Sequence, residues 1–372
     1  MSRKIKICLF SHFSYSLYNP KSKIVFGGAE VQLFLLSKEL SKEDLFEVHV
    51  IMGDSNYGLF RKEKYGSIDM HLVLPIKRNI FNVIIGVINL FLALIKINPD
   101  IVIQRGGAIP TGLIAIYCKL FRKNFIFSIA GINDLIMKKN EMFKQIFYKF
   151  GIENSNHVIA QRKDQIKLLK ERNLNIQKIT LIKSGYNIDN FQNIDKEYIL
   201  WVGRAIALKR PNIFLSLAKD FPNEHFIMIC PLSYEKVLFQ SIKDKAKKIS
   251  NLEFIDYVPF NKINQYFKSA KIFINTSLKE GFPNTFIQAV KNGTPIISLK
   301  VDPDNVLIKN RIGFSCNDNY YKLKEKIKYL LEHVKEYQEI SKNCHKYAKV
   351  NHDIRKVANK WKKIIINLFN KS

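Results

Sequence analysis

Short apolar runs alternate with amphipathic helical segments along almost the whole chain, and this alternation is the strongest constraint on its fold. Residues 5–10 and 101–104 have the length and composition of strands, and each is followed by a segment with apolar residues at helical spacing. Such alternation predicts a doubly wound parallel sheet. The polar segment 187–196 interrupts the pattern, which restarts at Tyr198. We therefore expect two α/β domains, with a ligand site in the cleft between them.

The expected domains are Rossmann-like. One occupies residues 1–190 and the second residues 191–350, while a last helix in 351–372 packs back on the first domain. Residues 80–97 are apolar enough to be mistaken for a membrane span, but they include Asn82 and Asn89 and are barely long enough. We expect them to form a buried crossover helix.

Charge is the clearest compositional signal. The 372 residues include 60 Lys and Arg against 32 Asp and Glu, a net charge of +28. Nucleic acid, an anionic membrane surface and phosphorylated small molecules would all suit this charge. The lysines are spread along the chain without a base-reading motif, so we expect no specific nucleic-acid binding. The five scattered cysteines indicate a reducing cytosol, and the N-terminus reads as a first strand and not as a secretory signal.

The stretch 277–289, SLKEGFPNTFIQA, joins an expected buried strand at 272–274 to an expected helix. Pro283 suits the first helical turn. The N-terminus of a helix presents unpaired backbone N–H groups, and Asn284 and Thr285 add side-chain donors. One carboxylate, Glu280, sits in the loop. The segment predicts an anion site, although a plain strand-to-helix connection remains the alternative.

A second phosphate signal lies upstream. Gly203 and Arg204 end the expected strand 198–202, where open α/β sheets bind ligands, and Lys209 follows in the same loop. Arg and Lys together with the helix start after Glu280 would form a positive pocket for a diphosphate. The alternative is that both are solvated loop cations. Gly27 and Gly28 open another helix and permit close ligand approach, or they form a simple hinge.

Three ordered motifs carry a family resemblance: GGAE at 27–30, VGR at 202–204 followed by Lys209, and EGFPNTFIQA at 280–289. Together they resemble family 4 of the retaining glycosyltransferases, enzymes of the two-domain GT-B fold. The resemblance implies that Arg204 and Lys209 hold the donor diphosphate and that Glu280 faces the donor sugar. It also implies donor contacts from Gly27, Gly28, Gly203, Gly281, Phe282, Pro283, Asn284, Thr285 and Gln288.

The sequence departs from the family pattern at two places. Members of the family usually carry a pair of glutamates separated by seven residues, and the second one holds the nucleotide ribose. Glu280 is the first of the pair here, but the second position is Gln288. We therefore expect weaker nucleotide binding and not lost activity. The loop after strand 125–129 lacks the histidine that many members carry. Asp134 is a candidate replacement there, or else a helix N-cap. His12 is an acceptor-side candidate, with an ordinary loop histidine as the alternative.

The resemblance implies that no protein nucleophile is needed, because the leaving phosphate accepts the acceptor proton. The segment 302–304, Asp-Pro-Asp, resembles a metal motif of another transferase fold, but it follows the expected strand 296–299 in a different fold context. We therefore expect a turn there and no metal. The helix expected at 141–150 interleaves lysines with phenylalanines. Its basic face would suit an anionic membrane, while its aromatic face is expected in the core.

The expected function is therefore the transfer of a hexose from a nucleotide-diphosphate sugar to a saccharide or lipid-linked acceptor, with retention of configuration, in the synthesis of a surface polysaccharide. Residues 1–190 would bind the acceptor and 191–350 the nucleotide sugar, with uridine the commoner family base than guanosine. We expect a cytoplasmic enzyme, at most in contact with the inner face of the plasma membrane. Two alternatives remain: a sugar-nucleotide epimerase or hydrolase on the same fold, and a basic nucleic-acid-binding protein.

Overall fold

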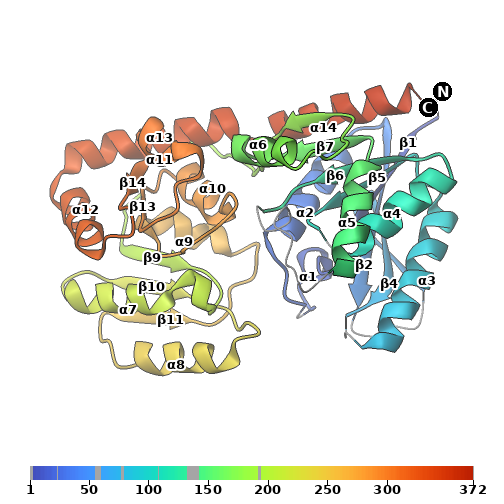
Figure 1. The fold of residues 1–372 in the computed structure, drawn as a ribbon. Coiled ribbons are helices and arrows are strands. Elements are labelled where there is room, and N and C mark those ends of the chain that lie inside the picture. The colour runs from blue at the N-terminus through green and yellow to red at the C-terminus, as the bar shows by residue number, and fades with distance from the viewer. Residues whose placement is uncertain are drawn as a thin grey trace. The chain divides into compact units, whose positions relative to one another are not determined.

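The computed structural model describes residues 3–22, 24–54, 60–76, 79–107, 109–131, 142–191 and 194–371. The chain forms two compact units (Figure 1). Unit 1 contains residues 1–185 together with 354–372, and unit 2 contains residues 186–353. The sequence had placed these divisions at residues 190 and 350. Each unit is built on its own twisted sheet, as the alternation of strands and helices predicts.

The sheet of unit 1 has the strand order β3-β4-β2-β1-β5-β6-β7-β8. Its strands pair in parallel except β3, which is antiparallel to β4. From the central strand β1 the chain proceeds to one side and later returns to the other with β5, so the sheet has a switch point between these two strands. The strands are β1 (Ile5–Phe10), β2 (Phe46–Asp54), β3 (Arg61–Tyr65), β4 (Ile68–Pro75), β5 (Ile101–Arg105), β6 (Asn124–Ser128), β7 (His157–Ala160) and β8 (Ile179–Leu181).

The helices of unit 1 cover this sheet, and the last of them returns from the far end of the chain. Helix α14 packs against α2, and Asn124 Nδ2 donates a hydrogen bond to the carbonyl of Leu368 at 3.4 Å. Lys362 on α14 forms an ion pair with Glu43. The helices are α1 (Tyr15–Tyr18), α2 (Gly28–Leu40), α3 (Ile80–Ile97), α4 (Ile109–Leu120), α5 (Met142–Glu153), α6 (Lys163–Glu171) and α14 (Ile354–Phe369).

Helix α3 has the bounds that the sequence predicts, but the expectation of a buried crossover helix is wrong. Its main neighbours are β4, β2 and α4. The buried residues are Asn82, Leu90, Ala93, Leu94 and Ile97. A helix that is apolar on all sides is normally predicted to be buried on all sides. The sequence alone does not show that one face of α3 has no neighbour. Among the described residues, α3 is the one helix long and apolar enough to cross a membrane.

The sheet of unit 2 is entirely parallel, with the order β11-β10-β9-β12-β13-β14. The chain leaves β9 toward β10 and β11 and returns on the other side with β12, so its switch point lies between β9 and β12. The strands are β9 (Tyr198–Val202), β10 (Phe226–Ile229), β11 (Leu252–Ile255), β12 (Ala270–Asn275), β13 (Ile296–Ser298) and β14 (Gly313–Ser315).

The helices of unit 2 follow its strands in turn. They are η3 (Ala207–Lys209), α7 (Pro211–Asp220), α8 (Lys236–Ala246), α9 (Ile263–Ser269), α10 (Asn284–Lys291), η4 (Pro303–Asn305), α11 (Val306–Lys309), α12 (Tyr320–Glu332) and α13 (Val334–Asn351).

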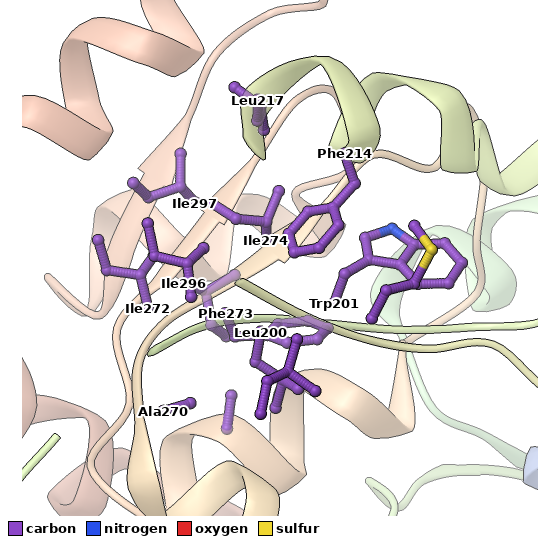
Figure 2. Close-up of a cluster of buried hydrophobic side chains, with 14 of the residues drawn as sticks. Leu200, Trp201, Phe214, Leu217, Ala270, Ile272, Phe273, Ile274, Ile296 and Ile297 are labelled. Carbon is purple, nitrogen blue, oxygen red and sulfur yellow. The ribbon is translucent and has the colours of Figure 1, made fainter. Parts of the chain in front are cut away.

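The core of unit 2 fixes the two strands that border its switch point. Figure 2 shows Leu200 and Trp201 of β9 packed with Phe273 of β12 and Phe214 of α7. Phe273 also lies edge-on to Phe286 of α10, with ring centroids 6.4 Å apart. Aromatic pairs at such distances add to the free energy of burial. The core therefore positions the carboxyl ends of β9 and β12 and the start of α10 together.

Candidate active site

Two loops meet at the switch point of unit 2. One follows β9 and includes η3, and the other follows β12 and leads into α10. The backbone N–H of Leu278 donates to the carbonyl of Leu208 at 2.9 Å, and Thr276 Oγ1 donates to the carbonyl of Lys209 at 2.6 Å. Loops that leave neighbouring strands in opposite directions form the crevice in which open α/β sheets bind ligands. These hydrogen bonds fix the two sides of that crevice relative to each other.

Glu280 is at the centre of this arrangement, and one of its oxygens is shared by three donors. Lys209 Nζ lies 2.6 Å from Glu280 Oε1. The same oxygen accepts hydrogen bonds from Ser277 Oγ at 2.7 Å and from Asn275 Nδ2 at 3.0 Å. Both members of the ion pair are largely buried, with side chains 13% exposed for Glu280 and 21% for Lys209. The carboxylate is therefore held in one orientation.

The environment of Glu280 keeps it ionised. Burial alone would raise its pKa, because a low-dielectric surrounding disfavours the charged form. The charge and hydrogen bond of Lys209, helped by Ser277 and Asn275, outweigh burial and bring the pKa below its ordinary value. At neutral pH Glu280 is therefore a carboxylate, and not a neutral acid.

Thr276 connects the core to this ion pair. Its hydroxyl accepts a hydrogen bond from Trp201 Nε1 at 2.9 Å, and its carbonyl accepts one from Arg210 Nε at 2.7 Å. Arg210 also forms an ion pair with Asp318 at 2.6 Å. Sequence reasoning did not single out Asn275, Thr276 or Ser277. Their signal was present, since they are three consecutive polar residues at the end of an apolar strand.

Arg204 lies at the carboxyl end of β9, as predicted. Its side chain is exposed, and it has no ion pair within the part of the chain that the structure describes. Gly203 precedes it in a confined position, because a Cβ there would lie 3.0 Å from Cη2 of Trp201. Arg204 is thus a cation at the mouth of the crevice, while Lys209 is paired inside it.

Helix α10 begins one residue later than the sequence predicts. Pro283 is its N-cap, with φ −63° and ψ 124°, and Asn284 and Thr285 form the start of the first turn. Gly281 and Phe282 lie in the loop before it, and the ring of Phe282 packs against His352 with centroids 5.1 Å apart. N–H groups in the first turn of a helix have no carbonyl partner within that helix, so this end favours an anion.

Gln288 lies one turn along α10 from Asn284, on the same side of the helix. It is 8% exposed. Its side-chain amide makes no hydrogen bond with any of the described residues. A side-chain amide can accept a hydrogen bond from one hydroxyl and donate to another, so Gln288 is suited to a ligand hydroxyl.

The unit 1 candidates have structural contacts of their own. Gly27 is the N-cap of α2, and its N–H donates to Glu30 Oε2 at 2.9 Å, so Glu30 caps the helix that Gly28 begins. His12 follows β1, hydrogen bonds to the carbonyl of Pro75 at 3.0 Å and stacks on Phe13. Asp134 lies outside the described residues. The structure therefore brings together the unit 2 candidates around Glu280, whereas Gly27, Gly28 and His12 lie in unit 1.

Two other groups of acidic residues contain potential metal ligands. Asp302 Oδ1 accepts a hydrogen bond from the N–H of Leu307, in the first turn of α11, at 2.9 Å. In unit 1, Glu47, His49 and Asp69 bring potential ligand atoms within 4.8 Å of one another. Lys62 Nζ already lies 3.1 Å from Asp69 Oδ2, and a nearby ammonium opposes cation binding.

Comparison with known proteins identifies unit 2. Residues 183–347 match the family model described as glycosyl transferases group 1. This part of the chain is therefore similar to the glycosyl transferases group 1 domain. It includes β9, β12 and α10, and therefore every residue of the arrangement around Glu280. The match agrees with the resemblance to glycosyltransferases that the three motifs carry.

Relatives and solved structures agree with the glycosyl transferases group 1 domain. The O-antigen chain mannosyltransferase RfbU of Salmonella typhimurium is 27% identical over 164 residues, which are 42% of this chain and 46% of RfbU. The alpha-monoglucosyldiacylglycerol synthase of Acholeplasma laidlawii is 26% identical over 141 residues, 37% of this chain and 33% of that protein. The chain thus spans less than half the length of these two curated relatives.

The fold matches over nearly its full length. A sucrose-phosphate synthase from Thermosynechococcus elongatus superposes with a TM-score of 0.81 and 14% sequence identity, over 99% of this chain and 100% of that one. The likeness shows the two-domain GT-B fold that the sequence predicts, with residues 183–347 in its second half.

Proposed function

We propose that the protein is a retaining glycosyltransferase that moves a hexose from a nucleotide-diphosphate sugar to a saccharide or lipid-linked acceptor. The observation that carries this proposal is the Lys209–Glu280 ion pair, fixed between two loops at the switch point of unit 2. A cation for phosphate and a carboxylate for sugar hydroxyls lie side by side there. That combination suits a sugar joined to a diphosphate.

In this proposal Arg204 and Lys209 bind the diphosphate, with the start of α10 facing the same anion. The Arg204 guanidinium can grip two phosphate oxygens, and Lys209 acts as a point charge. When the sugar leaves, negative charge grows on the diphosphate, and each fixed donor of this kind typically contributes roughly 10²–10³-fold to the rate. The proposal needs no metal ion for this charge, so transfer should survive a chelator.

Glu280 would accept hydrogen bonds from the donor sugar, and the Gln288 amide would bind the ribose. Three donors on Oε1 orient the carboxylate before any sugar arrives. Preorganisation of this kind lowers the cost of binding and of reaching the transition state. The amide of Gln288 can accept from one ribose hydroxyl and donate to the other.

For the acceptor we propose only a chemical class. One relative is named an O-antigen chain mannosyltransferase and another a glucosyldiacylglycerol synthase, so their names describe a polysaccharide and a lipid product. We infer a sugar or lipid-linked acceptor in surface polysaccharide or glycolipid synthesis, a cytoplasmic location and a uridine nucleotide in preference to a guanosine one.

Calorimetric titration with UDP and GDP tests the donor site. We expect one nucleotide to bind the native protein, and the Arg204→Ala and Lys209→Ala variants to lose at least about tenfold in affinity, since a charge-assisted hydrogen bond contributes about 1.5–3 kcal/mol. Lys248→Ala is the charge-matched control, because it removes an exposed cation at the amino edge of the same sheet. Binding unchanged in both site variants would overturn the proposal.

Product analysis then separates transfer from the alternatives. A transferase consumes the nucleotide sugar only when an acceptor is present. Steady release of free sugar or conversion of the donor without acceptor would identify a hydrolase or an epimerase instead.

A further inference from the structure

Helix α3 carries an exposed apolar face along its whole length. Ile80, Ile84, Ile88, Leu92 and Ile95 recur at intervals of three or four residues, and their exposed fractions run from 83% at Ile80 to 49% at Ile95. Residues at this spacing share one face of a helix. An 18-residue helix is about 27 Å long. Single exposed hydrophobic residues are ordinary on a protein surface, but a continuous strip of this length marks an interaction site.

The opposite side of α3 is anchored to unit 1. Leu90, Ala93 and Leu94 are buried in the core, and Asn89 Nδ2 donates to the carbonyl of Val73 at 2.8 Å. A membrane-spanning helix would have to leave these contacts. The helix is therefore suited to lie along a surface with its apolar face outward, and not to cross a bilayer.

The end of α4 extends the strip. Tyr117 OH donates to the carbonyl of Leu94 at 2.9 Å, and the Tyr117 ring contacts the rings of Phe91 and Phe121. These contacts place the end of α4 beside α3, as Figure 1 also shows. Leu120 is 70% exposed, and Phe121 is exposed as well. Two helices thus contribute to one apolar surface.

Positive charge surrounds this surface. Residues 76–123 contain seven Lys and Arg and a single acid, Asp100. Asp100 is already bonded to the guanidinium of Arg3 at 2.8 and 3.0 Å. Lys96, Lys119 and Arg122 are exposed, and none forms an ion pair within the described residues. A second copy of the chain would bring the same cations together, whereas anionic lipid head groups would complement them.

We propose that the exposed face of α3, continued by Leu120 and Phe121, inserts into the head-group region of a bilayer that contains anionic lipid. This surface is separate from the helix at 141–150, whose expected membrane contact stays a prediction. The inference does not depend on the donor site, because all of its residues belong to unit 1 and none contributes to the arrangement around Glu280.

Vesicle flotation tests the proposal. The full chain should float with vesicles made of equal parts phosphatidylglycerol and phosphatidylcholine. It should bind at least about tenfold more weakly to phosphatidylcholine alone, since apolar burial and attraction to anionic lipid act together. The triple variant Ile84→Ser, Ile88→Ser and Leu92→Ser should lose at least about tenfold in binding to the anionic vesicles.

A matched control uses three exposed valines of unit 2. The triple change Val237→Ser, Val334→Ser and Val350→Ser removes exposed apolar side chains elsewhere and should leave vesicle binding within about twofold. Circular dichroism melting checks that both triple variants remain folded. Equal binding of the α3 variant and the native chain would overturn the proposal.

Tryptophan fluorescence gives a second readout that does not depend on the loss of binding. In Ile88→Trp the new indole joins Trp201 and Trp361, both of which are buried. Its emission should shift to shorter wavelength with anionic vesicles and be quenched by brominated acyl chains. Emission unchanged by vesicles would contradict insertion. So would a concentration-dependent dimer in sedimentation that the α3 triple variant abolishes while no vesicle binding is seen.

Discussion

Lys209 Nζ lies 2.6 Å from Glu280 Oε1, and this ion pair joins the loop after β9 to the loop after β12. The same oxygen accepts two further hydrogen bonds, from Ser277 and Asn275. In the free protein, Glu280 therefore neutralises the cation that is proposed to bind the diphosphate. Glu280 and the phosphate of an incoming nucleotide would therefore compete for Lys209.

The first prediction follows from this competition. Glu280→Gln removes one negative charge from the crevice and keeps the size of the side chain. UDP alone should then bind about two- to tenfold more tightly, because the change in Coulomb energy is on the order of 1 kcal/mol at the effective dielectric of a partly buried site. Hexose transfer should nevertheless fall by at least about 100-fold, since an amide is a poorer acceptor for the sugar. Titration calorimetry and a transfer assay measure the two effects.

Glu253→Gln is the control for this change, because it removes an exposed carboxylate from β11 of the same sheet. Weaker UDP binding in Glu280→Gln would show that the carboxylate supports the nucleotide directly and does not compete with it.

The second prediction concerns pH. The folded protein lowers the pKa of Glu280 below its ordinary value near 4.5. A carboxyl with a lowered pKa in the folded protein stabilises the fold fully at pH values above its pKa in the unfolded chain. This stabilisation is lost as the pH falls through the pKa of the carboxyl in the folded protein. The difference in unfolding free energy between the native protein and Glu280→Gln should therefore be constant above about pH 5.5 and decrease at lower pH. Urea unfolding at a series of pH values measures it, and a difference that grows toward acid would contradict the assigned direction.

The third prediction separates the ion pair from its members. Lys209→Ala leaves a buried carboxylate without its cation, and removing one partner of a buried pair costs more than removing both. We expect Lys209→Ala to lose stability at neutral pH and the double variant with Glu280→Gln to recover part of it. The expected coupling energy is about 1–2 kcal/mol. Chemical unfolding of the four proteins in the cycle tests this, and additive effects would show that the two side chains do not stabilise each other.

Much of the fold could be predicted because the alternation of strands and helices is a local pattern. Strand β3 was missed, since Arg61–Tyr65 consists of charged residues and Tyr and reads as a loop. It is held as an edge strand by side-chain contacts, including an ion pair between Arg61 and Asp54 at 3.2 Å. Edge strands commonly carry charge, which hides them from hydrophobic patterns.

The site was predictable to the extent that strand order follows from chain topology. Adjacent β9 and β12 bring Lys209 and Glu280 together, and both had been selected from the sequence. The roles of Asn275, Thr276 and Ser277 could not be predicted, because they depend on side-chain hydrogen bonds between two irregular loops. The exposure of the apolar face of α3 could not be predicted either, because amino-acid composition does not reveal which face of a helix lacks a neighbour.

The last prediction concerns the departure at position 288. Gln288 is buried on α10, and its amide has no hydrogen bond to the described residues. Gln288→Glu should restore a charge-assisted bond to a ribose hydroxyl and tighten UDP binding about three- to tenfold, since such bonds exceed neutral ones by roughly 1 kcal/mol. The same change should lower the melting temperature of the free protein, because a buried carboxylate without a cation is costly. Gln288→Ala, which removes the amide, should weaken UDP binding instead. Calorimetry on the three proteins decides the matter: equal affinities would show that this side chain does not contact the nucleotide.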